Sequence, residues 1–306
     1  MRPELTQAIS LLRSNTPEAV EEAIGLLQNT VYSFSMKVCG HPEDAEDTMQ
    51  EVLFRSLGHL AKIQDPQALA VWLYTVTRNR CWRMRRKPAG APARTLSLDE
   101  LMPDDVELAR LLADAGSPES NLLQAEQNSL LHHAILRIPA QLRIVLVLHD
   151  VEELTTDQVA QILALQPGTV RVRLHRARLS VRKEMKQLLA AAPSQPGHPR
   201  TAAKEPHISP REGRKRPAEC RELFANLSEY LDGRVESKTC DQMRKHIEDC
   251  PSCVVFLRDL RAAIDRCNSL KFPCDPAVAA RLRSLLTREY LRILGMPLPE
   301  KIPASL

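Results

Sequence analysis

Cysteine and histidine residues near the end of the chain have the types and spacing of a zinc site. Cys220, His246, Cys250 and Cys253 follow the pattern C-x25-H-x3-C-x2-C. Three thiolates and one imidazole complete a tetrahedral Zn²⁺ site, and four protein ligands leave no position for a substrate water, so we expect structural zinc. Two alternatives stay open. Cys240 competes with Cys220 for the fourth position, or the cysteines pack as small buried hydrophobes.

The overall composition of the chain favours an all-α, cytoplasmic protein. Hydrophobic residues make up 43% of the 306 residues, but aromatic residues only 4%, and abundant Leu, Ala, Arg and Glu favour helices. The sequence contains no apolar signal core and no run of about 18 apolar residues. Eight cysteines in a reducing compartment indicate metal or redox chemistry. We expect the spare thiols to be inert rather than sensors of oxidants or metals: Cys240, Cys267 and Cys274.

Changes in composition divide the chain into three helical blocks and two linkers. The first block covers residues 1–87, the second block 120–190 and the third block 218–306. Residues 88–119 are interrupted by proline and glycine, which suits a flexible tether. Residues 191–217 are rich in proline and basic residues and are expected to be disordered.

The second block predicts a helix-turn-helix. Thr155 and Gln158 fit a capping box, and Pro167 suits the first position of the next helix. That helix carries an apolar stripe expected to face the core: Val170, Leu174, Ala177 and Val181. Its other faces carry Thr169, Arg171, Arg173, Arg176 and Arg178. Arginine can grip guanine in the major groove, so we predict DNA reading; the alternative is a solvated basic face.

The first block presents two candidate surfaces. Asp44, Asp47 and Glu51 are expected to line one exposed helix face, with Gln50 beside them and Phe54 nearby. The alternative is a helix start whose acidic residues only balance the helix dipole.

The second candidate surface follows at residues 69–87. Trp72 belongs to an apolar stripe and is expected in the core. Arg78, Trp82 and Arg85 form another stripe, in which basic groups attract phosphate and an exposed indole stacks on an unpaired base. Packing of Trp82 into the core is equally compatible with the pattern.

Several of these motifs occur together in one known family. They are Asp44-Ala-Glu-Asp-x-x-Gln50-x-x-x-Phe54, Trp72-Leu73 … Arg78-Asn79 … Arg85-Arg86, Leu136-x-x-Pro139 and Gly168-Thr-Val-x-x-Arg173-Leu-x-Arg176-Ala-Arg178. Over residues 5–190 the chain resembles the extracytoplasmic-function (ECF) sigma factors of bacterial RNA polymerase. The resemblance implies a region-two domain and a region-four helix-turn-helix.

The resemblance also implies roles for individual residues. The polymerase clamp helices would be bound by Asp44, Asp47, Gln50, Glu51 and Phe54. The loop 63–68, with Gln64 and Asp65, would capture a flipped base of the −10 element, and the non-template strand would be held by Arg78, Asn79, Trp82, Arg85 and Arg86. The −35 element would be read by Thr169, Arg171, Arg173 and Arg176.

The third block resembles the zinc-binding anti-sigma domain, through Leu227-Ser-x-Tyr230-Leu-Asp-Gly233 and the H-x3-C-x2-C set. Such domains usually form separate chains. A tethered one would act at an effective concentration of about millimolar, which implies an intramolecular contact and regulation of the sigma domains. An amphipathic tail follows, as a clasp over a sigma domain or packed on its own zinc domain: Val278, Leu282, Leu285, Leu286, Tyr290, Ile293 and Leu294.

We therefore expect a sigma factor that binds core polymerase and promoter DNA, with its two DNA-binding domains held apart by residues 88–119. It would perform no covalent chemistry, because no paired carboxylates or nucleophile–base pair accompany the closed metal set. The rival interpretation is a helix-turn-helix transcriptional regulator with a metal- or redox-sensing tail. The motif from Asp44 to Phe54 discriminates between them, since such a regulator needs no polymerase-binding helix.

Overall fold

The computed structural model describes residues 3–14, 16–84, 101, 124–191, 227–233, 241, 243–245, 251–268 and 270–296. The regular secondary structure in these ranges is helical throughout, which confirms the predicted all-α class. Apart from Leu101 and Ala191, the two predicted linkers lie outside these ranges.

The first block is built around one long central helix. Helices α1 (Pro3–Ser14), α3 (Pro42–Leu60) and α4 (Pro66–Met84) all pack against α2 (Pro17–Cys39). The central helix starts at Thr16, whose side chain caps the backbone N–H of Ala19, and ends at Gly40. Gly40 has a φ of 86°, and a Cβ there would lie 2.7 Å from the Leu136 side chain. Glycine is required at this position because the second block approaches the helix end so closely.

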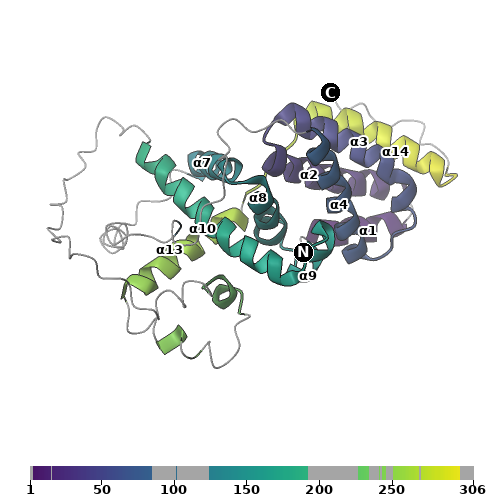
Figure 1. The fold of residues 1–306 in the computed structure, drawn as a ribbon. Coiled ribbons are helices and arrows are strands. Elements are labelled where there is room, and N and C mark those ends of the chain that lie inside the picture. The colour runs from purple at the N-terminus through teal and green to yellow at the C-terminus, as the bar shows by residue number, and fades with distance from the viewer. Residues whose placement is uncertain are drawn as a thin grey trace.

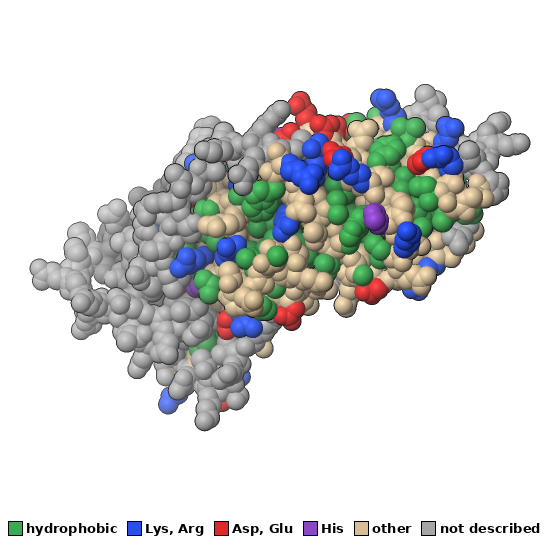
Figure 2. Space-filling view, turned by 45° about the vertical axis from the view of Figure 1, so that its right-hand side comes forward, with side chains coloured by type: hydrophobic (Ala, Val, Ile, Leu, Met, Phe, Trp, Pro, Cys, Tyr) green, Lys and Arg blue, Asp and Glu red, His purple; other side chains and the backbone are tan. Residues whose placement is uncertain are grey.

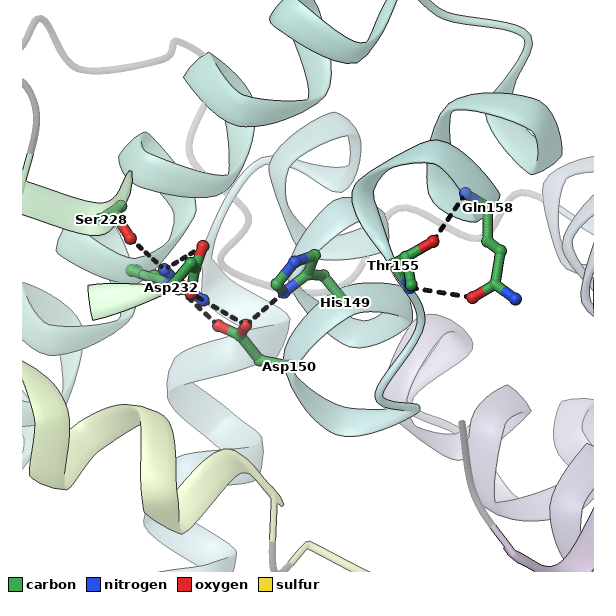
Figure 3. Close-up of polar contacts among 7 residues, drawn as sticks. His149, Asp150, Thr155, Gln158, Ser228 and Asp232 are labelled. Carbon is green, nitrogen blue, oxygen red and sulfur yellow. Dashed lines mark hydrogen bonds and ion pairs between the residues drawn. The ribbon is translucent and has the colours of Figure 1, made fainter. Parts of the chain in front are cut away.

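The second block has the predicted helix-turn-helix. It contains α7 (Gln124–Arg137), α8 (Ala140–Leu146), the π-helical turn η1 (Val147–Val151), α9 (Thr156–Leu163) and α10 (Pro167–Ala191). The predicted capping box is confirmed, because Thr155 Oγ1 accepts from the Gln158 N–H and Gln158 Oε1 accepts from the Thr155 N–H (Figure 3). The apolar stripe of α10 is buried as predicted, at Val170, Leu174, Ala177 and Val181.

The third block contacts both of the others at separate places. Helix α13 (Pro251–Asn268) packs against α10 and η1, whereas α14 (Pro276–Ile293) packs against α2 and α3. In Figure 1, α14 lies along the outer side of α2 and α3, and α13 lies beneath α10. A short helical segment, residues 227–231, also belongs to this block. The described part of the third block therefore reaches across the other two.

The first and second blocks are in direct contact. Helix α4 packs against α9, and one hydrophobic core includes buried residues from all three blocks. The expectation that the two sigma-like domains stand apart is therefore wrong for this structure. Among the described helices, none has the length and apolar character needed to cross a membrane.

Candidate nucleic-acid and polymerase interfaces

Helix α3 carries the acidic face expected to bind the polymerase. Asp47, Gln50 and Phe54 are exposed, and Phe54 is exposed by 42%, unusual for so large an apolar side chain. Glu51 is half-buried and pairs with Arg80 at 2.6 Å and with Arg55 at 3.0 Å.

Asp44 differs from the expectation, because it is only 6% exposed. It lies one helical turn before Thr48, and both belong to the buried stripe of α3. Because its side chain is buried, Asp44 does not line the exposed face together with Asp47. The predicted acidic surface is thus narrower than the sequence suggested.

The loop between α3 and α4 carries Gln64 and Asp65, both exposed. Asp65 Oδ2 accepts a 2.9 Å hydrogen bond from the Ala68 N–H and so caps α4. The Gln64 carbonyl accepts from Arg13 Nη2 at 2.9 Å, which fastens the loop to α1. The Gln64 side chain is therefore exposed to solvent, and two hydrogen bonds hold the backbone of its loop in place.

Three of the residues predicted to hold the non-template strand lie in an open groove between the first and second blocks. Arg78, Asn79 and Trp82 line this groove of about 620 Å³ together with Arg173 of α10. The Arg78 guanidinium donates to the Ile162 carbonyl at 2.6 Å and to Asn79 Oδ1. Trp82 is half-buried against the core and also lines the groove. Arg85 and Arg86 lie outside the described residues.

The predicted recognition helix offers a second groove. Thr169, Arg173 and Arg176 line a hollow of about 490 Å³ beside α8. Thr169 and Arg171 are exposed, whereas Arg173 and Arg176 are half-buried. On the face shown in Figure 2, Lys and Arg side chains gather in separate groups with hydrophobic side chains between them. The described residues thus present no single continuous basic stripe on that face.

Arg178 is buried rather than exposed, contrary to the expectation for this helix face. Its side chain is 2% exposed and pairs with Asp150 at 2.6 Å and with Asp232 at 2.8 Å (Figure 3). Burial alone would lower the pKa of Arg178, but the two carboxylates raise it above its usual value. Burial would likewise raise the pKa of Asp150, and the Arg178 charge instead lowers it. Arg178 therefore stays charged and serves packing rather than base reading.

The third block supplies part of this network. Asp232 pairs with Arg178, and Ser228 Oγ lies 2.8 Å from His175 Nδ1. His175 has its pKa lowered to about 4, first by burial and then by the Arg178 and Arg176 charges. The imidazole is therefore neutral near pH 7. Residues 228–232 thus contact two side chains of the helix predicted to read DNA.

A buried polar cluster, which the sequence did not reveal, joins the first block to the second. Lys37 Nζ of α2 lies 2.9 Å from Glu152 Oε1, and the Tyr74 hydroxyl of α4 donates to Glu152 Oε2 at 2.7 Å. We call these three residues the seam. Lys37 is fully buried and Glu152 almost so. Removing one partner of a buried ion pair destabilises a protein far more than removing one partner of an exposed pair.

Helix α14 covers the first block. Its buried residues include Ala279, Leu282, Leu286 and Tyr290, whereas Leu285 and Ile293 are exposed by 53% and 45%. The apolar face predicted for α14 therefore included two residues, Leu285 and Ile293, that are not buried. Gln28 of α2 donates to the Ala279 carbonyl at 3.2 Å and accepts from Arg283 Nε at 3.3 Å.

Of the predicted zinc ligands, only Cys253 lies within the described residues, half-buried in the first turn of α13. Cys220, His246, Cys250 and the competing Cys240 lie outside them. No group of three or more potential metal ligands is found among the described residues. Cys267 and Cys274 are buried, and burial raises the pKa of both thiols, that of Cys274 to about 11. Burial therefore favours the neutral thiol at both positions, and the inertness of the spare thiols stays a prediction.

Three families match successive parts of the chain. "Sigma-70 region 2" matches residues 24–90, "Sigma-70, region 4" matches residues 129–181, and "Putative zinc-finger" matches residues 220–253. These matches fall on the first, second and third blocks in turn.

Curated relatives include bacterial sigma factors. The ECF RNA polymerase sigma factor SigW of Bacillus subtilis is 24% identical over 190 residues, covering 61% of this chain and 100% of that protein. The RNA polymerase sigma-H factor of Pseudomonas aeruginosa is 24% identical over 189 residues, covering 61% and 96%. The Probable RNA polymerase sigma factor RfaY of Xanthomonas campestris pv. campestris is 29% identical over 174 residues, 56% of this chain but only 41% of that protein.

Proposed function

We propose that this chain directs promoter-specific transcription in the cytoplasm and that its own third block controls this activity. The chain belongs to the ECF sigma factors and carries their regions 2 and 4. A zinc-finger domain typical of anti-sigma factors follows these two regions. Sigma factors are initiation factors and not enzymes, so the function is binding. The observation that carries the proposed control is that the third block contacts both sigma regions.

Access to the polymerase is the first step that the third block would control. The proposed polymerase-binding residues Asp47, Gln50 and Phe54 lie on α3, and α14 packs against the same helix. Asp44 and Glu51, also proposed contacts, are buried and half-buried. Because α14 occupies one face of α3, a second helical partner could approach only the faces that α14 leaves open. We therefore propose that α14 must move before the polymerase is bound fully.

DNA recognition is the second step under this control. The −10 contacts Arg78, Asn79 and Trp82 share a groove with Arg173, a proposed −35 contact. Two elements more than one turn of duplex apart are separated by at least about 34 Å, which one groove cannot span. The closed arrangement is therefore proposed to be the inactive state. Opening it would let region 2, with Gln64, Asp65, Arg85 and Arg86, and region 4, with Thr169, Arg171 and Arg176, reach separate elements.

Core-dependent transcription tests the sigma activity. We expect full-length protein to support run-off transcription from a cognate promoter only when core polymerase is present. Asp47→Arg should weaken binding to core about tenfold or more, a loss of about 1.4 kcal/mol, because it reverses an exposed charge on α3. Core affinity is measured by fluorescence anisotropy of labelled protein.

Asp265→Arg is the matched control, since Asp265 is an exposed aspartate on α13, and it should leave core affinity unchanged. Promoter binding that is equally tight without core would favour the rival interpretation, a helix-turn-helix regulator. An equal loss of core affinity in both variants would show that α3 does not bind the polymerase.

Zinc is the cofactor that we propose for the third block. The donors Cys220, His246, Cys250 and Cys253 form a complete structural set for Zn²⁺, and Cys253 opens α13, which packs on region 4. When bound, zinc would supply folding energy and no catalysis, since apparent binding free energies reach about 10–16 kcal/mol in small zinc domains.

Replacing Cys250 with serine should therefore remove the metal and unfold the zinc-binding part of the third block. We expect about one zinc per wild-type chain by inductively coupled plasma mass spectrometry and a loss of most of it in the variant. Cys267→Ser serves as control, because Cys267 is buried in the hydrophobic core outside the predicted ligand set. Full zinc content in Cys250→Ser would refute this ligand set. Parallel Cys220→Ser and Cys240→Ser variants identify the fourth ligand.

A further inference from the structure

Helix α10 presents three faces that differ in what covers them. The core face is the buried stripe from Val170 to Val181. A second face, which we call the dock face, is spaced i, i+3, i+4, i+7 and i+11 and consists of His175, Arg178, Leu179, Arg182 and Lys186. A third face, the open face, is spaced i, i+3, i+4 and i+7 and consists of Thr169, Val172, Arg173 and Arg176. Residues at such spacings share one side of a helix, so the three sets point in three directions from the helix axis.

Charged contacts attach the third block to the dock face. Arg178 pairs with Asp232 at 2.8 Å, and Arg182 Nε donates to Asp259 Oδ2 of α13 at 2.6 Å. Lys186 Nζ lies 3.4 Å from the same Asp259 oxygen. Two carboxylates of the third block therefore engage three cations of α10. These cations are not available to DNA phosphates while the block is docked.

Apolar contacts strengthen the same attachment. Leu179 is fully buried in a second hydrophobic cluster, together with Leu227, Phe256 and Leu260 of the third block. The Arg182 guanidinium lies 4.3 Å from the centroid of the Phe256 ring, which is a cation–π contact. Undocking would expose this cluster to water, which is unfavourable.

The open face is left clear by the described part of the third block. Thr169 and Val172 are exposed, Val172 by 55%. This face borders the hollow of about 490 Å³, whose described lining residues come from α8 and α10 alone. The described neighbour from another block is region 2, because Arg173 also lines the groove that contains Arg78 and Trp82. Closure on region 2, rather than the dock, therefore restricts access to the open face.

We propose that residues 227–232 and α13 stay docked on region 4 while the open face binds duplex DNA, so that they and region 4 act as one DNA-binding unit. This inference rests on the proposed function and specifies which contacts have to open. A recognition helix contacts base edges with its N-terminal residues. The open face occupies that end of α10, whereas the dock face begins at His175. Duplex DNA can therefore enter without displacing the third block from α10, and the contacts that must open are those with region 2.

Carbodiimide crosslinking tests the proposal on the wild-type, full-length, zinc-loaded chain. This reagent joins an amine directly to a carboxylate that pairs with it. The Lys186–Asp259 pair, at 3.4 Å, joins the third block to region 4, and the Lys271–Glu4 pair, at 3.6 Å, joins it to α1 of region 2. Peptide mass spectrometry quantifies both links in the free chain and in its complex with core polymerase on a promoter duplex. Nuclease footprinting of the complex shows that the −35 region is occupied.

The two links should respond differently to promoter binding. We expect the Lys186–Asp259 link to stay within about twofold of its yield in the free chain, whereas the Lys271–Glu4 link should fall at least about tenfold as region 2 separates. Lys186→Arg keeps the charge but lacks a coupling amine, so absence of the first link in this variant confirms its assignment. A larger loss of the Lys186–Asp259 link overturns the proposal. Retention of both links would support the dock and contradict the opening of the closed state. A chain that gives neither a footprint nor a transcript would overturn the proposed sigma activity and this inference with it.

A charge reversal tests whether the docked block covers the open face. Asp259→Arg places a third cation beside Arg182 and Lys186 and should release α13 from α10, because like charges repel. The preference for the promoter over a template with a scrambled −35 element should change by less than about twofold, since base reading needs only the open face. Asp265→Arg, at an exposed position of the same helix, is the matched control. A larger gain in preference in Asp259→Arg alone would show that the docked block had covered the open face, and the proposal would be wrong.

Discussion

Glu152→Gln is expected to open the chain and to raise promoter-directed transcription. The substitution keeps the size of the side chain and an acceptor for Tyr74, but it removes the carboxylate that lies 2.9 Å from the buried Lys37 ammonium. Removing one partner of a buried ion pair costs about 3–5 kcal/mol, whereas Lys37 becomes hydrated once the two regions separate. The closed-to-open equilibrium should therefore shift more than about a hundredfold. Small-angle X-ray scattering measures the opening, and run-off transcription with core polymerase measures the activity.

Two further variants decide whether the seam itself is responsible. Glu153→Gln removes an adjacent but exposed carboxylate and should change neither measurement. The double variant Lys37→Met with Glu152→Leu replaces the ion pair by apolar side chains, which is often neutral or stabilising, and should restore the closed form. If Glu152→Gln stays as compact and as inactive as the wild type, the seam does not hold the regions together.

Leu286→Arg is expected to release α14 from region 2 and likewise to raise transcription. Leu286 is fully buried where α14 packs against the first block. An arginine there loses the apolar burial and places a charge in the core, a change of at least about 3 kcal/mol. The helix should then detach while α2 and α3 keep their own packing. Hydrogen exchange of the α14 amides reports the detachment, and core affinity together with run-off transcription reports its consequence.

The adjacent residue provides the matched control. Leu285 lies on the same helix but is 53% exposed, so Leu285→Arg should leave exchange and transcription as in the wild type. Rapid exchange of α14 without any gain in transcription would show that the helix is a scaffold and not an inhibitor. Equal effects of the two variants would mean that α14 is not seated as the structure shows.

The two predictions address different contacts of one closed state. The seam links region 2 to region 4 directly. The third block contacts region 2 through α14 and region 4 through residues 228–232. Tethering makes each contact intramolecular and so raises its effective concentration to about the millimolar range. A signal that weakens either set would therefore favour opening without needing to break every contact at once.

The helices and the helix-turn-helix followed from the sequence because their causes are local. The Thr155–Gln158 capping box, the entry of α10 at Pro167 and the stripe from Val170 to Val181 depend on residues a few positions apart. The sigma motifs and the Cys/His spacing are local in the same sense, and the matching families fall on the same three blocks. The contacts of individual site residues with polymerase, DNA and zinc stay predictions.

Only the tertiary structure decided which polar side chains are buried and which residues they meet. Lys37 meets Glu152 across 115 positions and Arg178 meets Asp232 across 54, so no local period could place them. Asp44 and Arg178 resemble exposed charges in the sequence, yet packing encloses both. The sequence by itself determined the helices and the chemical character of their faces, since these depend on propensity and spacing. The pairing of those faces was decided by tertiary packing, because the free energy of burying a charge depends on a partner far along the chain.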